Sequence, residues 1–240
     1  MDMEHEVPPL KPRANDERYY GRGTFLGVTG LGLSSLLWGA PVWNALKGIT
    51  KPISSAAQSI GVVPDGWRIY TIASTMPRFD PQSWRLRISG LVDTPLELTY
   101  KELLALPRTE TVADFHCVTG WSVSNVHWAG VRFDDLLAAA GLKPQAHALT
   151  FISAEKPYVD SLTLQQLRLP QVMLAYEMDG KPLTRAHGAP VRVVIPEMYG
   201  YKNTKWVEEI VAAPAAIAGY WEQNGYDVDA WVGRSNGYSS

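Results

Sequence analysis

Several short runs of apolar and β-branched residues, separated by turn signals, constrain the fold of this chain more than any other feature. Runs of this length and composition are typical of β-strands. They are bounded by turn-forming pairs such as Asp179-Gly180. The sequence therefore predicts strands over residues 148–153, 172–177, 191–196 and 206–211.

A strand and two helices are expected in the preceding part of the chain. Residues 84–91 alternate between polar and apolar positions, as in a half-buried strand. Thr99 predicts the start of a helix over 99–106, because Glu102 lies three residues further on and completes a capping box. A second helix is predicted over 133–140, ended by Gly141. Since strands outnumber helices and do not alternate with them regularly, we expect a mixed α+β domain rather than a doubly wound sheet.

The composition excludes one class of partner. Apolar residues make up 46% of the 240 residues, which is enough for one large core or two smaller ones. The formal net charge is −2, and Lys and Arg are scattered, so nucleic acid is not an expected partner. The chain has a single cysteine, which excludes an intramolecular disulfide and leaves the redox compartment open.

The stretch 23–46 carries no charged residue and is long enough to cross a bilayer, for which about 20 apolar residues suffice. More basic residues precede this stretch than follow it, which places the N-terminus in the cytoplasm. We therefore predict a cytoplasmic tail over 1–22, a transmembrane or signal-anchor helix over 23–46, a linker over 47–66 and a globular domain over 67–240. In this arrangement the protein is membrane-anchored and its globular domain is periplasmic or extracellular.

Other interpretations of the N-terminal stretch stay open. It is also compatible with a buried or surface helix of a globular protein. Residues 22–26 resemble a twin-arginine export signal, but Gly23 stands where the second arginine belongs. Small residues at 55–57 would allow cleavage, yet the apolar stretch is longer than a typical signal and ends well before them. We favour an uncleaved anchor.

Cys117 lies in the sequence DFHCVTGW, after a strand-like stretch and just before a glycine. Such a strand-to-loop junction presents its side chains to ligands, and a thiolate suits a transition metal. No second cysteine exists for a zinc or iron–sulfur site built from thiolates. Two alternatives remain: a small buried apolar side chain, or the nucleophile of a thiol hydrolase partnered by His116 or His127.

A second dense region of polar side chains runs over 179–210. Its donors could surround a phosphate if the turns between them converge, although a basic loop of this kind can also be merely solvated. Arg192 adjoins a short apolar run, which would hold its charge near a core strand, and a buried cation needs an anion. The donors are Lys181, Arg185, His187, Arg192, Lys202, Asn203 and Lys205.

Together these regions resemble the sulfite oxidase superfamily of molybdopterin-dependent oxidoreductases. The resemblance covers roughly residues 67–226 and is strongest to the branch that contains the bacterial protein-methionine-sulfoxide reductase catalytic subunit. It is carried, in order, by Phe-x-Cys-x-x-x-Trp-Ser around Cys117, Trp-x-Gly at 128–130, Tyr-Glu-x-x-Gly-Lys-Pro-Leu at 176–183, His-Gly-Ala-Pro-Val-Arg at 187–192 and Tyr-Gly-Tyr-Lys-Asn-x-Lys-Trp at 199–206.

The resemblance implies a molybdenum–molybdopterin cofactor with one pyranopterin per chain, and Cys117 as the metal ligand and catalytic residue. It further implies cofactor-binding roles for Tyr70, Thr71, Ser153, His187, Arg192, Asn203 and Lys205. The implied reaction is oxygen-atom transfer on a small-molecule or protein-bound S- or N-oxide, or on a sulfite-like substrate. The sequence departs from true sulfite oxidases because residues 119–126 carry no charge, which disfavours an arginine-rich sulfite pocket.

The electron partner and the substrate side are less defined by the sequence. No CxxCH haem motif is present, so electrons must come from another protein or a soluble carrier, and we expect a membrane-bound haem or quinone-linked protein. Candidates for the substrate side are Trp121, His127, Tyr158 and Arg185. The alternative to an enzyme is a docking subunit of a membrane complex that retains the fold and offers Tyr220, Trp221 and Trp231 to a partner.

Overall fold

The computed structural model describes residues 61–62 and 66–234. The predicted tail 1–22, the predicted membrane helix 23–46 and nearly all of the linker 47–66 lie outside the described residues. The chain divides into two compact units, 1–55 and 56–240, and all that follows concerns the second. Within the described residues, none of the helices has the length and apolar character that a membrane crossing requires.

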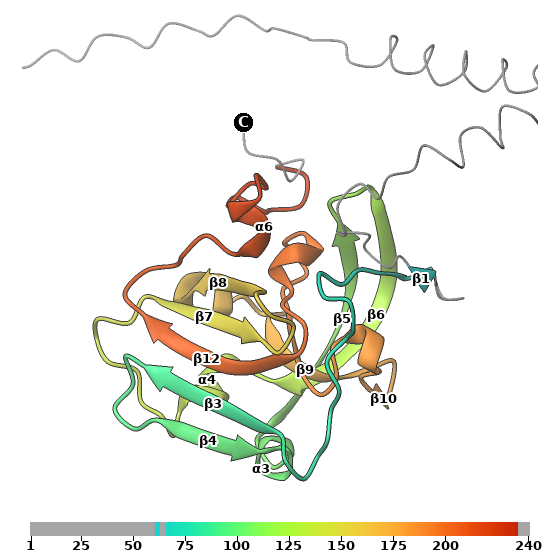
Figure 1. Cartoon of the computed structure of the whole chain (residues 1–240). Helices are drawn as coiled ribbons and strands as arrows, with labels where there is room; N and C mark the ends of the chain where they lie inside the picture. Colours follow the sequence, from blue (N-terminus) through green and yellow to red (C-terminus); the bar gives the residue numbers. More distant parts are fainter. Residues whose placement is uncertain (1–60, 63–65, 235–240) are drawn as a thin grey trace, which may run out of the picture. The chain divides into compact units, whose positions relative to one another are not determined.

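A five-stranded mixed sheet forms one side of this unit (Figure 1). Strand β12 is parallel to β3 on one side and antiparallel to β7 on the other, while the remaining pairs are antiparallel. The strands are, in spatial order, β4 (Leu96–Thr99), β3 (Arg85–Gly90), β12 (Val207–Ala213), β7 (Ala148–Ser153) and β8 (Val159–Thr163).

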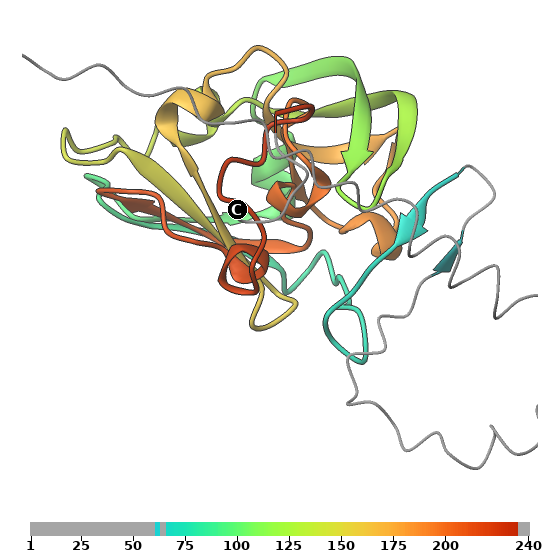
Figure 2. The ribbon, with the colours of Figure 1, turned by 90° about the horizontal axis from the view of Figure 1, so that it is seen from above.

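The second sheet is antiparallel and is built on a long hairpin of β5 and β6, which lies across the unit from the first sheet in both ribbon views (Figures 1 and 2). Its order is β10 (Lys181–Pro182), β9 (Met173–Met178), β6 (Trp121–Val131) and β5 (Arg108–Cys117), and β11 (Arg192–Val194) also pairs with β9. Two short strands, β1 (Gly61–Val62) and β2 (Arg68–Ile69), pair separately.

The helices are short and connect the strands. Thr99 and Glu102 form the predicted capping box at the start of α3: the Thr99 hydroxyl accepts the Glu102 N–H at 3.2 Å, and the Glu102 carboxylate accepts the Thr99 N–H at 2.8 Å. The described helices are α3 (Tyr100–Leu104), α4 (Phe133–Leu137), α5 (Leu164–Leu167) and α6 (Tyr220–Gln223), with the 3₁₀ turns η1 (Arg185–His187) and η2 (Gly200–Lys202).

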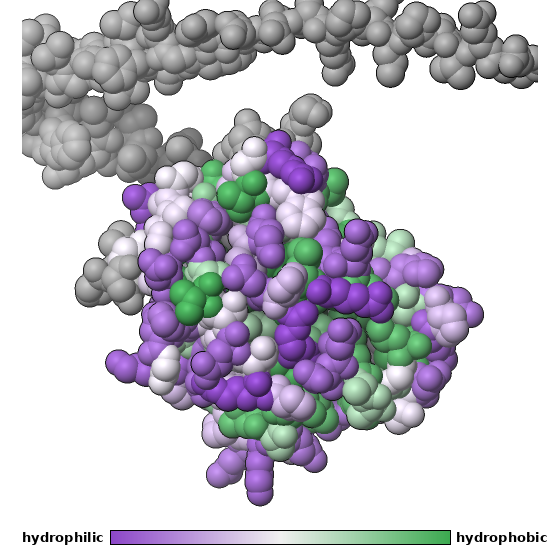
Figure 3. All heavy atoms as spheres, turned by 180° about the vertical axis from the view of Figure 1, so that it is seen from behind, coloured by the Kyte–Doolittle hydropathy of each residue, from purple (hydrophilic) through white to green (hydrophobic). Residues whose placement is uncertain are grey.

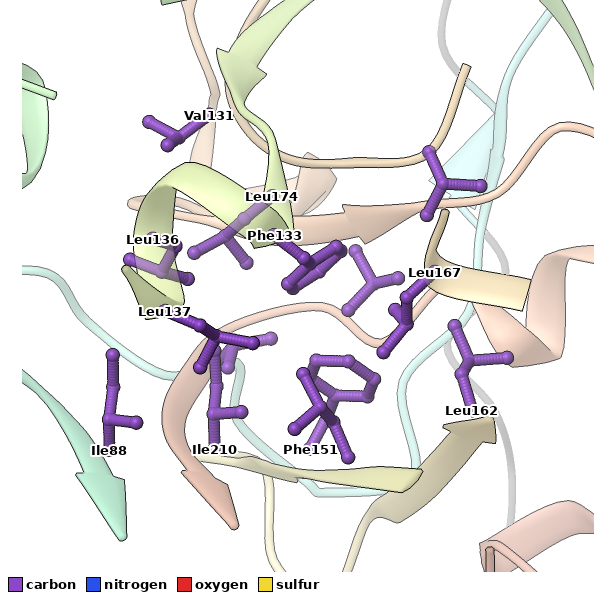
Figure 4. Packing of buried hydrophobic residues seen from close by; sticks show 14 of the residues in the cluster. Ile88, Val131, Phe133, Leu136, Leu137, Phe151, Leu162, Leu167, Leu174 and Ile210 are labelled. Atoms are coloured by element: carbon purple, nitrogen blue, oxygen red, sulfur yellow. The ribbon is translucent and has the colours of Figure 1, made fainter. Parts of the chain in front are cut away.

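The main core lies between the two sheets, with α4 inside it. Figure 4 shows Phe133 and Leu137 of α4 directed towards Phe151 of β7 and Ile210 of β12, while Leu174 of β9 closes the other side. Burying each of these side chains contributes about 1.5–3 kcal/mol. A second apolar cluster, around Trp67 and Trp128, lies against the second sheet. On the face seen in Figure 3, hydrophobic residues are interspersed with hydrophilic ones.

The predicted α+β class is confirmed, with one mixed sheet and one antiparallel sheet. The strand over 148–153 has its predicted bounds, and the strands near 84–91, 172–177, 191–196 and 206–211 are present with shifted ends. The helix predicted over 133–140 is wrong at its end. It stops at Leu137, because the N–H groups of Ala140 and Gly141 both bond to the Leu137 carbonyl in a turn.

Candidate functional site

Cys117 is the last residue of β5 and begins the tight turn into β6. The Gly120 N–H donates to the Cys117 carbonyl oxygen at 3.0 Å, and Gly120 has a φ of +86°, which favours glycine. Cys117 is half-buried, and its Sγ atom lies 3.2 Å from Thr119 Oγ1, which is itself 3.4 Å from the hydroxyl of Tyr70. The thiol therefore stands at a strand-to-loop junction, as predicted.

A cavity of about 130 Å³ opens beside Cys117, and seven of the eight residues predicted to bind the cofactor line it. They reach it from distant parts of the chain: the segment after β2, the end of β5, the η1 turn, β11, and the loop between η2 and β12. The lining residues from the prediction are Tyr70, Thr71, Cys117, His187, Arg192, Asn203 and Lys205. Their roles as cofactor ligands stay a prediction.

Arg192 brings a buried positive charge to this cavity, with only 3% of its surface exposed. Its guanidinium lies over the rings of Trp128 and Phe115, at 5.2 and 5.6 Å from their centroids. It donates to the carbonyl oxygens of His187 and Asn203, at 3.3 and 3.4 Å. Burial lowers the pKa of Arg192 to about 10. Among the described residues, no carboxylate lies within 4.0 Å of this guanidinium to neutralise it.

Lys205, which is half-buried, places a second cation at the same cavity. Its Nζ donates to the Tyr70 carbonyl oxygen at 2.6 Å and lies 4.1 Å from the ring centroid of Trp206. Burial, together with the positive charge of Arg192, lowers the pKa of Lys205 to about 7, and Glu155 opposes this shift. No salt bridge to Lys205 is formed within the part of the chain that the structure describes. Two neighbouring cations of this kind, one buried and one half-buried, are suited to bind an anion.

The other donors of the 179–210 region do not reach the cavity. Lys202 forms salt bridges with Asp160, at 2.5 Å, and with Glu222. Lys181 is exposed in β10, and Arg185 donates to the carbonyl oxygen of Pro77 at 3.0 Å. The prediction that all seven donors could surround one phosphate is therefore wrong for these three.

Two predicted cofactor residues already have hydrogen-bond partners within the protein. The Ser153 hydroxyl does not line the cavity, since it donates to the Lys205 carbonyl oxygen at 2.8 Å and accepts the Glu155 N–H at 3.0 Å. Asn203 lines the cavity, but its Oδ1 accepts the Ile195 N–H at 2.9 Å. Ser153 thus holds the loop that carries Lys205, and Asn203 is bonded to Ile195, which directly follows β11, the strand that carries Arg192.

The substrate-side candidates divide into two pairs. Trp121 and Tyr158 line the cavity, and the Tyr158 hydroxyl donates to the Tyr201 carbonyl oxygen at 2.6 Å. His127 lies instead in a separate surface pocket beside Arg108, and Arg185 is held at the loop near Pro77. The prediction of a substrate-side position is therefore wrong for His127 and Arg185.

The thiol hydrolase alternative finds no support. His116 precedes Cys117 in an extended strand, where successive side chains point to opposite faces, and its Nδ1 lies 2.8 Å from Ser122 Oγ. His127 lines another pocket. Neither histidine forms a hydrogen bond with Cys117 Sγ in the described structure, so neither is placed to act as its base.

Sequence reasoning missed several residues of the cavity. Trp67 packs edge-on against His187, with ring centroids 4.9 Å apart, and also contacts Phe115. Glu155 accepts the Ile72 N–H at 2.9 Å. Only Phe115 had a local signal, because it belongs to the Phe-x-Cys motif. Trp67 and Glu155 enter the cavity through contacts with residues far away in the sequence.

Cys117 shares one cavity with Arg192 and Lys205, two cations that form no salt bridge within the described residues, and this combination is typical of an enzyme that binds an anionic metal cofactor. The family model described as the oxidoreductase molybdopterin binding domain matches residues 73–221, which is more than half of the chain. The chain therefore belongs to the molybdopterin-binding oxidoreductase family. The resemblance to the sulfite oxidase superfamily and the predicted molybdenum–molybdopterin cofactor are confirmed at this level.

Similar proteins support this assignment. An uncharacterized oxidoreductase of Bacillus subtilis is 39% identical over 154 residues, which are 63% of this chain and 77% of that protein. The protein-methionine-sulfoxide reductase catalytic subunit of Campylobacter jejuni is 30% identical over 167 residues, 62% of this chain and 55% of its own length. The sulfite oxidase of Arabidopsis thaliana is 31% identical over 180 residues, 60% of this chain and 46% of its own length.

A solved structure shows the same fold. The sulfane dehydrogenase SoxCD from Paracoccus pantotrophus matches with a TM-score of 0.60 and 26% sequence identity, covering 88% of this chain and 59% of that chain. The chain thus spans less than two thirds of this structure and of the reductase and sulfite oxidase relatives.

The residues present fit a molybdopterin. Arg192 and Lys205 supply the charge that a phosphate needs, and Cys117 supplies a soft ligand for the metal. Trp121, which also lines the cavity, has a buried indole Nε1 with no hydrogen-bond partner among the described residues, and this N–H is available to a polar ligand.

The three aromatic residues of the docking-subunit alternative make contacts within the protein. Trp221 lines the cavity, Tyr220 stacks on Tyr158 with ring centroids 5.7 Å apart, and Trp231 packs against the main core. Each of them is half-buried. Together with the retained Cys117 and the family assignment, this favours an enzyme.

Proposed function

We propose that this oxidoreductase transfers an oxygen atom between water and the sulfur of a neutral sulfide, so that it interconverts an S-oxide and its sulfide, with N-oxides and sulfite as poorer substrates. The observation that carries the proposal is the cavity itself, which brings Cys117 together with Arg192 and Lys205. In the reducing direction, the sulfoxide takes up two electrons and two protons and yields the sulfide and water. The relatives named as a methionine-sulfoxide reductase and as sulfite oxidases support chemistry at an oxidised sulfur.

Each residue of the cavity has a definite task in this proposal. When bound, the molybdenum cofactor supplies the two-electron oxygen-atom exchange. Cys117 would ligate the metal through its thiolate, and Arg192 and Lys205 would bind the phosphate of the pterin. Thr119, 3.2 Å from Cys117 Sγ, is placed to donate a hydrogen bond to the thiolate, which tunes a metal site.

The rest of the cavity favours a neutral substrate. Once the cofactor phosphate is bound, Arg192 and Lys205 are neutralised, and the one further cation in the lining is Arg68, which is exposed to solvent. A sulfite dianion would need buried cations. Sulfur groups make favourable contacts with aromatic rings. The aromatic lining consists of Trp67, Tyr70, Phe115, Trp121, Tyr158, Tyr201, Trp221 and Tyr226.

The test uses the full chain purified from cells that make the cofactor. We expect reduced methyl viologen to drive the reduction of methionine sulfoxide and dimethyl sulfoxide, and sulfite oxidation to be at least about tenfold slower. Cys117→Ser removes the activity, whereas His127→Gln, in a separate surface pocket, retains it. Sulfite oxidation faster than sulfoxide reduction, or full activity in Cys117→Ser, would contradict the proposal.

We further propose that the protein is anchored in a membrane, with the catalytic unit on the periplasmic or outer side and a haem- or quinone-linked membrane protein as electron partner. The uncharged stretch 23–46 and its basic flanks support this arrangement. The full chain is expected to stay in the membrane fraction after alkaline carbonate washing, and a variant lacking residues 1–46 is expected to be released. Release of the full chain would contradict the anchor.

A further inference from the structure

Glu155 is the one carboxylate among the described residues that lines the cofactor cavity. It follows β7 and is buried, with 3% of its surface exposed. Its Oε1 accepts the N–H groups of Ile72 and Ala73, at 2.9 and 3.4 Å. The Thr71 hydroxyl donates to the same oxygen. Three consecutive residues of the 70–73 loop therefore converge on one carboxylate oxygen.

Hydrogen bonds also connect Glu155 to Lys205. The Glu155 N–H donates to Ser153 Oγ at 3.0 Å, and Ser153 Oγ donates to the Lys205 carbonyl oxygen at 2.8 Å. The Nζ of Lys205 in turn donates to the Tyr70 carbonyl oxygen at 2.6 Å, next to Thr71. The contacts form a closed ring through three segments that are far apart in the sequence. Tyr70 and Lys205 both line the cavity, so the ring sets the distance between them.

The charge of Glu155 matters for the same ring. Arg192 and Lys205 both bring a positive charge to this cavity, and they repel each other. The Glu155 carboxylate favours the charged form of Lys205 and so offsets part of that repulsion. Even when the negative charge of Glu155 is counted, the described residues that line the cavity carry more positive than negative charge, which suits a phosphate.

We infer that Glu155 is a positioning residue for the molybdenum cofactor: its carboxylate holds the 70–73 loop at a fixed distance from Lys205, so that both sides of the cavity are formed before the cofactor enters. The inference concerns the same site as the proposed function and rests on it. It assigns no contact between Glu155 and substrate. The test therefore measures hydrogen exchange in the 70–73 loop and retention of molybdenum, and neither measurement depends on turnover.

The experiment compares the full chain with Glu155→Ala and Glu155→Gln. Glutamine keeps an acceptor oxygen for the 70–73 loop, whereas alanine removes it. We expect Glu155→Ala to lose molybdenum during dialysis about tenfold faster than the unaltered protein, as is usual when a group that orients a metal site is removed. Hydrogen exchange at the amides of Ile72 and Ala73 should also become faster, because their acceptor is gone. Glu155→Gln keeps the acceptor and loses the charge, so it should keep exchange at Ile72 and Ala73 slow and should lose molybdenum more slowly than Glu155→Ala.

Leu162→Ala provides a control for general destabilisation, because Leu162 is fully buried in the main core and away from the cavity. It should lower the melting temperature and leave molybdenum retention unchanged. Equal loss of molybdenum in Leu162→Ala, or in Glu155→Gln, would overturn the inference, as would unchanged exchange at Ile72 and Ala73 in Glu155→Ala. Absence of molybdenum from the unaltered protein would contradict the proposed function instead, and the exchange measurement would still decide the role of Glu155.

Discussion

The side-chain Nζ of Lys205 donates a hydrogen bond to the backbone carbonyl oxygen of Tyr70 at 2.6 Å, although 135 residues separate the two in the sequence. This contact joins the loop before β12 to the segment just before residue 73, where the match to the family's domain begins. It also places an ammonium beside Arg192, in a cavity with a single carboxylate among its described lining residues. The anion site is thus assembled by the fold rather than by one local motif.

The charge of Lys205 predicts a pH-dependent affinity for anions. Burial and Arg192 lower the pKa of Lys205 to about 7, so the protein must take up a proton to bind an anion at higher pH. We expect sulfate, whose charge is constant in this range, to bind the cofactor-free protein about tenfold more weakly per pH unit above pH 7. Isothermal titration from pH 6 to 9 measures this, and Lys205→Met should abolish the dependence. A flat profile in the unaltered protein would refute it.

The lowered pKa of Lys205 also predicts how the stability of the cofactor-free protein changes with pH. A lysine whose pKa is depressed in the folded state binds fewer protons there than in the unfolded chain. The stability that this lysine contributes is therefore complete above pH 10.5, which is its pKa in the unfolded chain. This stability is lost as the pH falls through about 7, which is its pKa in the folded protein. Chemical denaturation of the cofactor-free protein between pH 7 and 10 should show this gain with rising pH, and Lys205→Met should reduce it.

Arg192→Met separates binding of the cofactor from folding. Methionine fills a similar volume without a charge, and the cost of burying an unneutralised guanidinium is removed, although its contacts with Trp128 and Phe115 are lost. We expect the free energy of unfolding of the cofactor-free protein to be unchanged or raised by about 1–2 kcal/mol, and molybdenum content to fall. A destabilised protein that keeps its molybdenum would show that Arg192 serves the fold alone.

Much of the fold could be predicted from local patterns, and the limits of that prediction are physical. The strand over 148–153 and the Thr99–Glu102 cap depend on near neighbours and appeared where expected. Lys202 and Lys205 lie three residues apart in one basic segment, yet one forms salt bridges with Asp160 and the other lines the cavity. That difference is decided by residues from other segments, which no local pattern reveals.

The residues of the candidate site also divide into those that a local motif reveals and those that only long-range contacts place in the site. Cys117 and the residues around it were found because the motif is contiguous and its spacing is specific. The 70–73 loop meets Glu155 across more than 80 residues of sequence, so its acceptor had no local signal. The long β5–β6 hairpin was only partly predicted, since polar residues occupy many of its positions.

Gly188 predicts a specific steric effect on the cofactor site. Its φ is +102°, and a Cβ there would lie 2.8 Å from the Cβ of Lys205. Gly188→Ala should therefore strain the backbone by about 1–2 kcal/mol and also displace Lys205, which lowers molybdenum content. Gly180→Ala is the matched control: its φ is +71°, but nothing lies within 4 Å of the added atom. Equal molybdenum content in both variants would exclude the displacement of Lys205.

The buried cluster of Lys202, Asp160 and Glu222 predicts a second pH effect. One ammonium faces two carboxylates, and burial with the negative charge of Glu222 raises the pKa of Asp160 to about 7. A carboxyl group whose pKa is raised by folding stabilises the folded protein fully below its pKa in the unfolded chain, here 3.8. This stabilisation is lost as the pH rises through the folded-state pKa of about 7.

Asp160→Asn should remove this loss of stability between pH 4 and 7, as measured by thermal unfolding. Lys202→Met should cost about 3–5 kcal/mol near neutral pH, because it leaves two buried carboxylates without a cation. A similar pH slope in Asp160→Asn and in the unaltered protein would assign the slope to other groups.

The most direct test of the central claim is molybdenum K-edge X-ray absorption on the full chain and on Cys117→Ser, each produced in cells that make the cofactor. We predict near-stoichiometric molybdenum in the unaltered protein and one sulfur neighbour fewer around the metal in Cys117→Ser, because we propose that Cys117, which lines the cavity, ligates the metal through its thiolate. The same number of sulfur neighbours in both proteins, or no molybdenum in the unaltered chain, would contradict the account.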